Sequence, residues 1–301
     1  MDEPGVARAI CSRGHNSYTC RVPDQRTDAS PSTSPVSSPA AALEHRLIEA
    51  CAAVGPMVVA FSGGVDSALL SVAAHRALPG ATWLVTADSA SFAQGELDHC
   101  RSFAATWGIP WQPAATGELD DPRYLTNAGD RCYWCKTALM DQILPLATQV
   151  GAAVVLGVNL DDLTDHRPGQ QAAAERGARF PLVEAGFTKS DVRALAKEWG
   201  LKEWDRPAMP CLSSRIPYGT PVSISLLSRI DRAEAAVRAL GFADVRVRHY
   251  EDTARIELPA ADLARATMRA AQLVDSLTTI GYRYVTLDLA GLRSGNLNRT
   301  P

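Results

Sequence analysis

The chain has 301 residues, 46% of them hydrophobic and 21% charged, and a formal net charge of −3 from 30 basic and 33 acidic residues. This is the composition of an ordinary globular protein, long enough for one large domain or two moderate ones, and it argues against a disordered chain. It also weighs against a nucleic-acid partner, because binding to nucleic acid rests on an excess of Lys and Arg facing phosphates.

No apolar run approaches the roughly 20 residues that span a bilayer. The first twenty residues are interrupted by charged and polar side chains, unlike a signal peptide. We therefore expect a cytoplasmic protein with no membrane partner. Thiols stay reduced in that compartment, so the cysteines are expected to be free, catalytic or metal-bound rather than disulfide-paired. They are Cys11, Cys20, Cys51, Cys100, Cys132, Cys135 and Cys211.

The segment 1–38 is predicted to be a disordered tail. Residues 23–40 are rich in Ser, Pro and Thr and have few large apolar side chains. Such a stretch cannot bury enough surface to offset the entropy lost on ordering. Cys11 and Cys20 lie in this tail, and we expect no function for them.

Residues 39–218 predict an α/β domain. Short apolar runs typical of strands lie at 56–61, 82–88, 109–115 and 152–159. They alternate with helical patterns at 41–54, 66–78, 92–108, 136–151 and 188–200. In the last helix Thr188 is the predicted N-cap, Asp191 the capping-box residue and Gly200 the C-cap. Apolar strands alternating with amphipathic helices favour a parallel sheet covered on both faces, which binds ligands at the carboxyl ends of its strands.

The pattern changes after about residue 220. Two long helical patterns, 225–241 and 261–281, flank two strands with alternating apolar residues, 243–250 and 254–258. A last strand is expected at 282–289. These elements predict a second, smaller α+β domain over residues 219–301.

The stretch SGGVDS (62–67) lies between a predicted strand and a predicted helix. Glycines let the backbone turn sharply and approach a ligand closely. The N–H groups and the dipole at a helix start favour a phosphate group there. The stretch is not a Walker A loop, because the G-K-[ST] ending is absent. A plain strand-to-helix turn is the alternative, and the ordered set of Ser, Gly, Asp and Ser in this context argues against it.

This motif resembles the PP-loop of the ATP pyrophosphatases. The resemblance implies an adenine nucleotide α-hydrolase-like fold for 39–218 and cleavage of ATP between its α and β phosphates. It also implies that a carboxylate or amide-type oxygen is activated as its AMP ester and then attacked by nitrogen or sulfur. Asp66 is expected to help bind Mg²⁺ through the pyrophosphate. The residues expected to bind ATP are Ser62, Gly63, Gly64, Asp66 and Ser67.

Three cysteines form a second candidate site. Cys132 and Cys135 have C-x-x-C spacing, and Cys211 lies in the stretch RPAMPCLSSRIPYGT. Alone, the pair is compatible with a redox pair, half a zinc site, iron–sulfur ligands or two packed cysteines, and Cys211 with simple packing. No second C-x-x-C completes a zinc site, although His166 is an available fourth ligand. Three cysteines with an open fourth position suit a [4Fe–4S] cluster that binds an extra sulfide.

Residues 157–201 and 204–220 resemble the LarE family, the PP-loop sulfur transferases of nickel-pincer nucleotide synthesis. The resemblance extends from about residue 41 to the end. It implies that the enzyme converts both carboxylates of pyridinium-3,5-biscarboxylic acid mononucleotide into thiocarboxylates, giving a product that later binds nickel and serves lactate racemase and related enzymes. It further implies sulfide or another sulfur donor as a partner, and a homo-oligomer. The domain 219–301 is then expected to serve substrate binding or oligomerisation.

Within this family the cysteine at the Cys211 position handles the sulfur. Some members have it alone and sacrifice its sulfur, whereas others add a C-x-x-C and, as the resemblance implies, hold a [4Fe–4S] cluster. Because Cys132 and Cys135 are present, we predict the cluster type, with all three cysteines as catalytic ligands. The alternatives are sacrificial donation from Cys211, a PP-loop tRNA-thiolation enzyme and a non-catalytic nucleotide-binding module.

Basic and acidic residues add further candidates. Arg246 and Arg248 alternate on a predicted strand and so point to one face. From the resemblance, we expect them and Arg215 to bind the substrate phosphate, which suits the planar guanidinium fork; solvated arginines paired with acids are the alternative. Glu234 is predicted either to hold a metal or to orient an arginine. Lys136 is predicted to neutralise phosphate charge near the adenylate.

The loop after the strand at 152–159 is the last candidate region. Gly157 is expected to let the nucleotide approach the backbone. The polar side chains that follow are Asp161, Asp162, Asp165 and Arg167. A loop at the carboxyl end of a buried strand is the usual ligand-facing place. We therefore predict cofactor binding there, with Asp162 as the selected residue.

Overall fold

The computed structural model describes residues 11–14, 17–20, 38–164 and 167–293, which fall into two compact units, 1–37 and 38–301. In the first unit, strands β1 (Cys11–Gly14) and β2 (Ser17–Cys20) pair antiparallel. These strands lie in the segment where a disordered tail is predicted. The rest of that segment lies outside the described residues, so its disorder stays a prediction.

The second unit is built on a four-stranded parallel sheet in the order β5–β4–β3–β6. The two interior strands are β4 and β3, and each pairs with a neighbour on both sides. Strand β3, which leads into the glycine-rich loop, is called the central strand below. Because all four strands run the same way, the loops at their carboxyl ends gather at one edge of the sheet. The strands are β3 (Met57–Ala60), β4 (Thr82–Asp88), β5 (Trp111–Ala115) and β6 (Ala153–Leu156).

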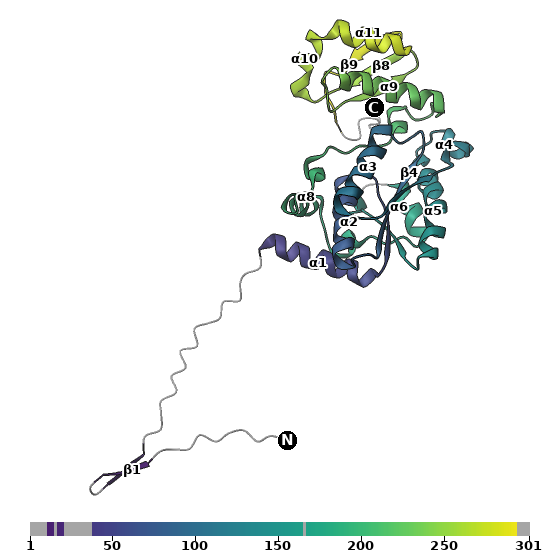
Figure 1. Ribbon diagram of the computed structural model, residues 1–301. Helices are drawn as coiled ribbons and strands as arrows, with labels where there is room; N and C mark the ends of the chain where they lie inside the picture. The colour runs from purple at the N-terminus through teal and green to yellow at the C-terminus, as the bar shows by residue number, and fades with distance from the viewer. Residues whose placement is uncertain (1–10, 15–16, 21–37, 165–166, 294–301) are drawn as a thin grey trace. The chain divides into compact units, whose positions relative to one another are not determined.

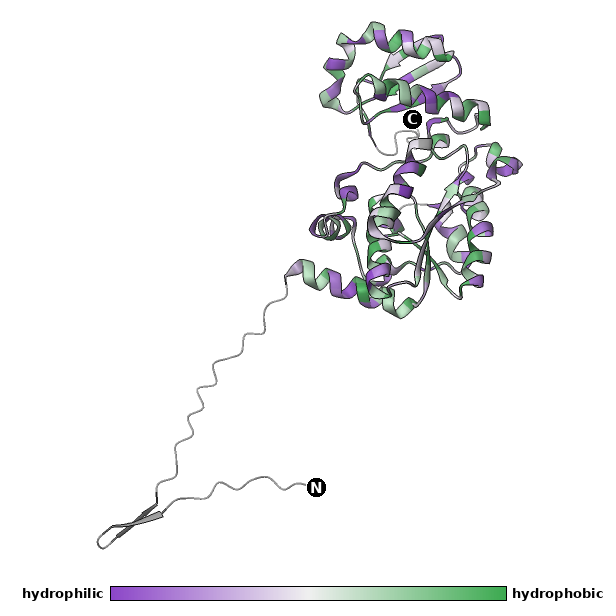
Figure 2. Cartoon of the chain, in the orientation of Figure 1, coloured by the Kyte–Doolittle hydropathy of each residue, from purple (hydrophilic) through white to green (hydrophobic). Residues whose placement is uncertain are grey.

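Helices cover both faces of this sheet (Figure 1). Side chains alternate along the central strand: Val59 and Phe61 pack into one core, and Val58 and Ala60 into the other. Hydrophobic and hydrophilic residues accordingly alternate along the covering helices in Figure 2. On the first face lie α1 (Pro39–Val54), α2 (Val65–Ala77), α3 (Gln94–Trp107) and α8 (Lys189–Glu198), and on the second α5 (Arg131–Gln149) and α6 (Pro168–Glu175).

Local sequence explains several helix ends. Ser38 accepts the Ala41 N–H through its side chain and is followed by proline, so α1 begins there. The predicted capping box of Thr188 and Asp191 is confirmed at the start of α8. That helix ends at Glu198, and Gly200 follows with a φ of +72°. Short helices complete this part: η1 (Glu118–Asp120), α4 (Pro122–Leu125), η2 (Leu160–Thr164), α7 (Pro181–Glu184), η3 (Lys202–Asp205) and η4 (Leu212–Arg215).

The C-terminal elements form a separate three-stranded sheet in the order β7–β8–β9. Strands β7 (Arg246–Tyr250) and β8 (Thr253–Glu257) are antiparallel, and β9 (Tyr284–Leu287) runs parallel to β8. Helices α9 (Ile224–Ala239) and α11 (Ala270–Ile280) pack against this sheet through a core of their own.

The single helix predicted at 261–281 is wrong, because the chain forms η5 (Ala260–Asp262), α10 (Leu263–Met268) and α11. Arg265 and Arg269 reach back to the Gly241 and Leu240 carbonyl oxygens at the end of α9. These bonds hold the chain where the helix is interrupted. They join residues more than twenty positions apart, so the local pattern carries no sign of them.

The α/β fold with a parallel sheet and a smaller C-terminal α+β part is confirmed. The boundary predicted at 218/219 stays a prediction, since residues 38–301 form one compact unit. Among the described helices, none is long and apolar enough to cross a membrane.

Candidate nucleotide and thiol site

The glycine-rich loop joins β3 directly to α2. Gly63 has a φ of +73°, a conformation that favours glycine, and an added Cβ would lie 3.0 Å from the ring of His99. The Ser67 hydroxyl donates to the Gly64 carbonyl at 3.0 Å and accepts the Ser62 N–H at 3.3 Å. The loop is thus a tight, internally bonded turn. It presents the first N–H groups of α2 at the edge where the strands end, a geometry that suits a phosphate group.

Asp66, in the first turn of α2, contacts two residues that follow it in the chain by 93 and 123 positions. Its Oδ1 accepts a hydrogen bond from Asn159 Nδ2 at 2.9 Å. Its Oδ2 lies 2.5 Å from Lys189 Nζ, the ammonium of the first residue of α8. The Asp66 side chain is 19% exposed, so its carboxylate is accessible from solvent. A carboxylate in this position is a suitable oxygen ligand for Mg²⁺.

Gly157 follows β6 and lies against the start of α2. A Cβ on this residue would lie 2.6 Å from the Ser67 nitrogen and 2.8 Å from the Asp66 carbonyl carbon. Because such approaches are shorter than van der Waals contact, only glycine fits there. Contact between two backbone segments therefore explains this glycine, and the expected approach of a nucleotide stays a prediction.

The acidic loop after β6 is held by bonds among its own residues and with α8. The Asn159 side-chain oxygen accepts the N–H groups of Asp161 and Asp162, and Asp162 accepts the Asn159 N–H at 3.2 Å. Asp161 accepts the Lys189 N–H at 2.8 Å, and Asp162 pairs with Arg167 at 2.8 Å. These carboxylates shape the loop that carries Asn159 to Asp66. Cofactor binding by Asp162 stays a prediction.

Cys211 lies close enough to Cys132 and to Cys135 to interact electrostatically with both. Cys132 and Cys135 lie at the start of α5, which begins five residues earlier than predicted, and Cys211 directly precedes η4. Cys132 is exposed and Cys135 is half-buried. Desolvation by the surrounding protein raises the pKa of both thiols, and the nearby Cys211 raises each pKa further. At Cys132 the Arg131 guanidinium opposes this rise most strongly, and the Lys136 ammonium opposes it at both cysteines. Cys132 and Cys135 therefore favour the protonated form unless a metal or another cation stabilises their thiolates.

Buried polar side chains hold the Cys211 loop against α4 and α5. The Tyr124 hydroxyl and the Ser213 hydroxyl lie 2.5 Å apart, and Arg131 donates to the Ser213 carbonyl at 2.8 Å. The Leu212 N–H donates to the Ser91 carbonyl, next to the end of β4. Because an unpaired buried polar group is unfavourable, this network specifies one position for the loop.

Arg215 and Glu234 form a buried ion pair, with side chains 1% and 0% exposed. Arg215 donates from Nε to Glu234 at 2.7 Å and from Nη1 to the Pro210 carbonyl at 2.6 Å. Glu234 also accepts from Arg238 and from the Val247 N–H. Of the two roles predicted for Glu234, this arrangement fits orientation of an arginine and gives no support to a metal ligand. It likewise gives no support to phosphate binding by Arg215, whose guanidinium faces protein acceptors.

Arg246 and Arg248 extend from one face of β7 to the chain around Cys211. Arg248 pairs with Glu257 at 3.0 Å and donates to the Ser214 carbonyl at 2.5 Å. Arg246 donates to the carbonyls of Ala208 and Arg293, both at 3.1 Å, and forms no ion pair within the described part of the chain. Burial lowers the pKa of Arg246, the charges of Arg215 and Arg248 lower it further, and those of Glu257 and Glu234 oppose the change. Arg215 and Arg248 are paired with Glu234 and Glu257, whereas the partners of Arg246 among the described residues are carbonyl oxygens.

Among the residues that the structure describes, no group of three or more His, Cys, Asp or Glu side chains is arranged to hold a metal ion. Free thiols are present at Cys51, Cys100, Cys132, Cys135 and Cys211. A [4Fe–4S] cluster takes its thiolates on separate irons, and three cysteines close together are a suitable donor set for it. Asp165 and His166, the second being the alternative fourth ligand, lie outside the described residues.

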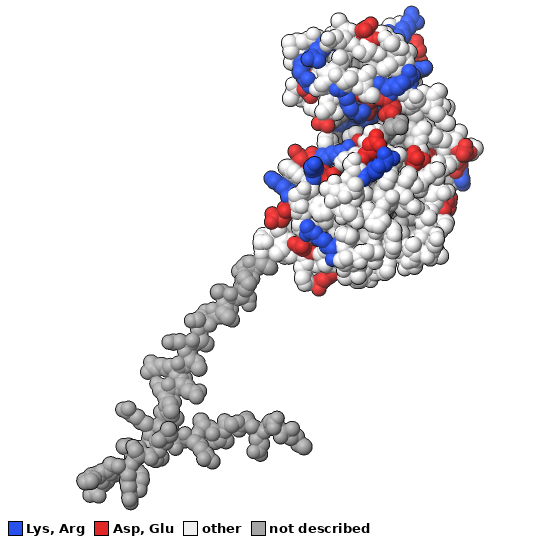
Figure 3. Space-filling view, in the orientation of Figure 1, with Lys and Arg blue, Asp and Glu red and all other residues white. Residues whose placement is uncertain are grey.

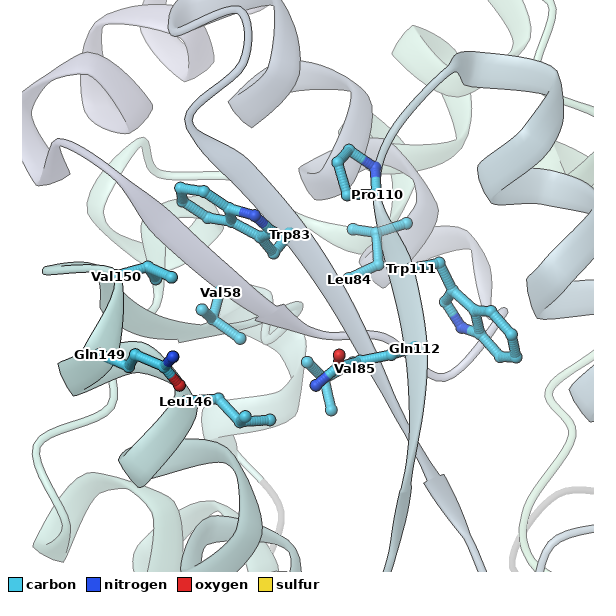
Figure 4. A pocket seen from close by; sticks show the side chains of 10 residues that line it. All are labelled: Val58, Trp83, Leu84, Val85, Pro110, Trp111, Gln112, Leu146, Gln149 and Val150. Carbon is cyan, nitrogen blue, oxygen red and sulfur yellow. The ribbon is translucent and has the colours of Figure 1, made fainter.

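A cavity of about 230 Å³ lies elsewhere on the sheet. Its walls include Trp83, near the start of β4, and Trp111, the first residue of β5 (Figure 4). It therefore lies toward the amino ends of the strands, away from the glycine-rich loop. On the face in Figure 3, Lys and Arg side chains lie among Asp and Glu side chains instead of forming a continuous basic surface.

Three residues that the sequence interpretation did not single out contact the loop: Asn159 and Lys189 at Asp66, and Arg206 at Gly63. Asn159 and Lys189 had a usable signal, because one ends a strand at the ligand-facing edge and the other opens a capped helix. Arg206 had none beyond its place before a proline.

A tight glycine loop at the carboxyl edge of a parallel sheet defines an α/β protein suited to binding a phosphate group. No family model matches the chain. It is 44% identical over 245 residues to an uncharacterized protein of Synechocystis sp., covering 80% of this chain and 91% of that protein. It is 40% identical over 246 residues to the pyridinium-3,5-bisthiocarboxylic acid mononucleotide synthase of Lactiplantibacillus plantarum, covering 81% and 89%. An uncharacterized protein of Methanocaldococcus jannaschii is 25% identical over 239 residues, covering 79% and 91%.

The identity to the Lactiplantibacillus plantarum synthase extends over most of both chains. The chain belongs to the LarE family, as the sequence motifs predicted.

Proposed function

We propose that this protein is an ATP-dependent sulfur transferase that converts the carboxylates of pyridinium-3,5-biscarboxylic acid mononucleotide into thiocarboxylates. One observation carries the proposal: the glycine-rich loop and the three thiols lie in one unit, joined by the short segment from Arg206 to Cys211. The 40% identity to a synthase named for the bisthiocarboxylic product supports the choice of substrate.

The first half-reaction is adenylation. A substrate carboxylate oxygen attacks the α-phosphorus of ATP, the bond to the bridging oxygen breaks, and pyrophosphate leaves. The N–H groups at the start of α2 and the Ser62 and Ser67 hydroxyls suit the phosphates. Lys189 is paired with Asp66 in this structure. Once a cation binds the Asp66 carboxylate, the Lys189 ammonium can contact the phosphates instead. Mg²⁺ bound there would neutralise charge on the leaving pyrophosphate.

The second half-reaction is sulfur transfer. A hydrosulfide attacks the acyl carbon of the adenylate, AMP leaves, and a thiocarboxylate and a proton remain. We assign Cys132, Cys135 and Cys211 as ligands of a [4Fe–4S] cluster, which would supply an iron site for the incoming sulfide. Arg131 at Cys132 and Lys136 at both cysteines oppose the rise in pKa that desolvation causes, and their positive charges would support the thiolates that such a cluster needs.

Arg246 is the residue we assign to the substrate phosphate. Its guanidinium is buried, has carbonyl oxygens as its hydrogen-bond partners, and lies close to the positive charges of Arg215 and Arg248. A phosphate dianion would supply Arg246 with the anionic partner that Arg215 and Arg248 already have, and it would accept two hydrogen bonds from the planar guanidinium. Arg248 contributes charge there, although Glu257 already neutralises part of it.

The test is an anaerobic assay with the biscarboxylate mononucleotide, ATP, Mg²⁺ and sulfide. Formation of AMP, pyrophosphate and a thiocarboxylate over several turnovers supports the proposal. Iron and labile sulfide are measured in parallel in the wild type and in Cys132→Ala, and we expect iron to be lost in the variant. A single turnover that leaves dehydroalanine at residue 211 would replace the cluster by sacrificial donation. Pyrophosphate release with tRNA and none with the mononucleotide would overturn the substrate assignment.

We further propose a homo-oligomer that works on a small molecule, without nucleic acid or membrane, in the cytoplasm. The mixed charges on the face in Figure 3 support a small substrate over a polyanion. Light scattering of the purified chain tests the oligomer directly.

A further inference from the structure

We propose that Arg206 is a positioning residue that ties the glycine-rich loop to Cys211, so that filling the loop with nucleotide fixes the position of the cysteine. This inference rests on the proposed function, because it takes the loop as the ATP site and Cys211 as the sulfur-handling residue. Three features carry it: the contacts of Arg206, the stiffness of segment 206–211, and the contacts that hold Cys211.

The Arg206 guanidinium contacts the loop directly. Its Nη1 donates to the Gly63 carbonyl oxygen at 3.2 Å, and its Nη2 donates to Glu96 Oε1 at 2.6 Å. The positive φ of Gly63 sets the direction of that carbonyl, and Glu96 is only 12% exposed. Because both partners are fixed by their surroundings, a change in the Gly63 peptide must move Arg206 or break one of the two bonds.

The main chain at Arg206 is held by α8. Arg193, on that helix, donates to the carbonyl oxygens of Trp204 at 2.8 Å and of Arg206 at 3.4 Å. The first residue of the same helix, Lys189, pairs with Asp66. Helix α8 is therefore linked to the glycine-rich loop in two ways. Its first residue, Lys189, pairs with Asp66, and its Arg193 binds the main chain of Arg206, whose side chain contacts Gly63.

The segment from Arg206 to Cys211 is short and stiff. Its sequence is RPAMPC, and five residues of fully extended chain span at most about 17 Å. Prolines at 207 and 210 fix their own φ angles and restrict the residues before them to extended conformations. Arg206 has the expected angles, φ −65° and ψ 132°. A segment with this proline content acts as a semi-rigid spacer, so a displacement at Arg206 is passed to Cys211 and is not absorbed on the way.

The far end of the segment is held by arginines that come from later in the chain. Arg246 donates to the Ala208 carbonyl at 3.1 Å, and Arg215 donates to the carbonyls of Pro210 and Cys211 at 2.6 and 3.3 Å. The Cys211 main chain therefore has fixed acceptor contacts of its own. The spacer limits any further movement of Cys211. The other end of the spacer, Arg206, contacts the glycine-rich loop that we propose binds the nucleotide.

The test is hydrogen–deuterium exchange of the full chain, with and without Mg²⁺ and a saturating amount of α,β-methylene-ATP. In the wild type we expect the nucleotide to slow amide exchange at least threefold in two regions, 61–70 and 208–216. In Arg206→Ala we expect slowing at 61–70 alone. Arg206→Lys keeps one donor for the Gly63 carbonyl and should restore part of the slowing at 208–216. Arg101→Ala, which removes an exposed arginine of α3, is the control and should match the wild type.

A second variant keeps Arg206 and Cys211 and makes the segment between them more flexible. Pro207→Gly with Pro210→Gly leaves Arg206 in place, and we expect it to lose the slowing at 208–216 as Arg206→Ala does; it also replaces that variant if Arg206→Ala fails to fold. Slowing at 208–216 in either variant equal to that of the wild type overturns the inference. Slowing at 61–70 alone in the wild type also overturns it and leaves the proposed function standing. No slowing anywhere in the wild type removes the proposed nucleotide site and this inference together.

Discussion

The glycine-rich loop and the Cys211 loop are built in opposite ways. In the first, Ser62, Gly64 and Ser67 bond to one another within five positions of the chain. In the second, the carbonyls of Ser213 and Ser214 accept hydrogen bonds from Arg131 and Arg248, which lie 82 and 34 residues away. The first loop closes on itself through local hydrogen bonds, although Arg206 also reaches Gly63 from far along the chain, whereas remote arginines hold the second loop. Substitutions at the two loops should therefore have different consequences.

The substitution Cys211→Ser should separate the functions of the two loops most clearly. We expect thiocarboxylate formation to fall at least about a thousandfold, because an alcohol oxygen neither binds iron as a thiolate does nor donates sulfur. Adenylation of the substrate, measured as pyrophosphate release, should continue, since the glycine-rich loop is intact. Cys51→Ala, at a buried cysteine of the core, serves as the control and should keep both activities. Loss of both activities in Cys211→Ser would show that the two loops do not work separately.

The tertiary contacts of the Cys211 loop are tested by Glu234→Ala. This change leaves the buried Arg215 without its charge partner, and we expect about 3–5 kcal/mol of lost unfolding free energy. The measurement is urea unfolding followed by circular dichroism. Glu184→Ala breaks the more exposed pair with Arg179 and should remove no more than about 1 kcal/mol. Equal losses in the two variants would contradict the structural role assigned to Glu234.

Gly157→Ala tests how closely the chain packs under the glycine-rich loop. The new methyl group would lie 2.6 Å from the Ser67 nitrogen, so the backbone must shift. We expect a loss of about 1–3 kcal/mol in unfolding free energy, together with weaker ATP binding by calorimetry. Gly95→Ala, in α3 with no atom within 4 Å of the new methyl group, should instead be neutral or slightly stabilising. Full stability and full ATP affinity in Gly157→Ala would show that the contact is unimportant.

Lys189→Met separates charge from packing at Asp66. Removing the ammonium should weaken ATP binding by roughly tenfold, because a charge-assisted contact with phosphate contributes about 1.4 kcal/mol or more. Calorimetric titration with ATP and Mg²⁺ measures the change. Lys197→Met, on the same helix next to Trp204, should bind ATP as the wild type does. Unchanged affinity in Lys189→Met would remove this residue from the phosphate site.

The smallest effect concerns alkaline pH. Burial raises the pKa of Cys100 to about 11 and that of Cys51 to about 12. Between about pH 9 and 11 the unfolded chain loses these protons while the folded chain keeps them, so stability falls as the pH rises. Each thiol adds a slope of up to about 1.4 kcal/mol per pH unit. Cys100→Ala should reduce that slope in unfolding experiments at pH 8, 9 and 10, and an unchanged slope would contradict the raised pKa.

The fold was predictable to the extent that local periodicity encodes it. Four apolar runs between amphipathic patterns predicted the parallel sheet, and the capping box of Thr188 and Asp191 was confirmed. The interrupted helix at 260–280 was missed, because Arg265 and Arg269 bond to residues of another helix. The family assignment from the motifs is confirmed by relatives that match along most of their length.

The candidate site was predictable only where residue type alone decides the chemistry. Glycines, serines and an aspartate at a helix start pointed to phosphate, and cysteines pointed to thiol chemistry. Charged residues were harder to assign, because an arginine can bind a phosphate, a carboxylate or a backbone carbonyl, and the sequence does not say which one it faces. Arg215 was therefore predicted to bind phosphate and Glu234 either to hold a metal or to orient an arginine, and the structure pairs these two residues with each other.

The amino-acid sequence by itself determined the strand–loop–helix at residues 57–77, because local patterns and short-range hydrogen bonds define it. It also determined the family, because the family's motifs are short stretches of sequence. Only the tertiary structure decided that Lys189 faces Asp66, that Arg206 reaches Gly63, and that Arg131 and Arg248 bond to the Cys211 loop. The physical reason is distance along the chain. Hydrogen bonds between remote residues depend on how whole helices and strands pack, and no short stretch of sequence records that packing.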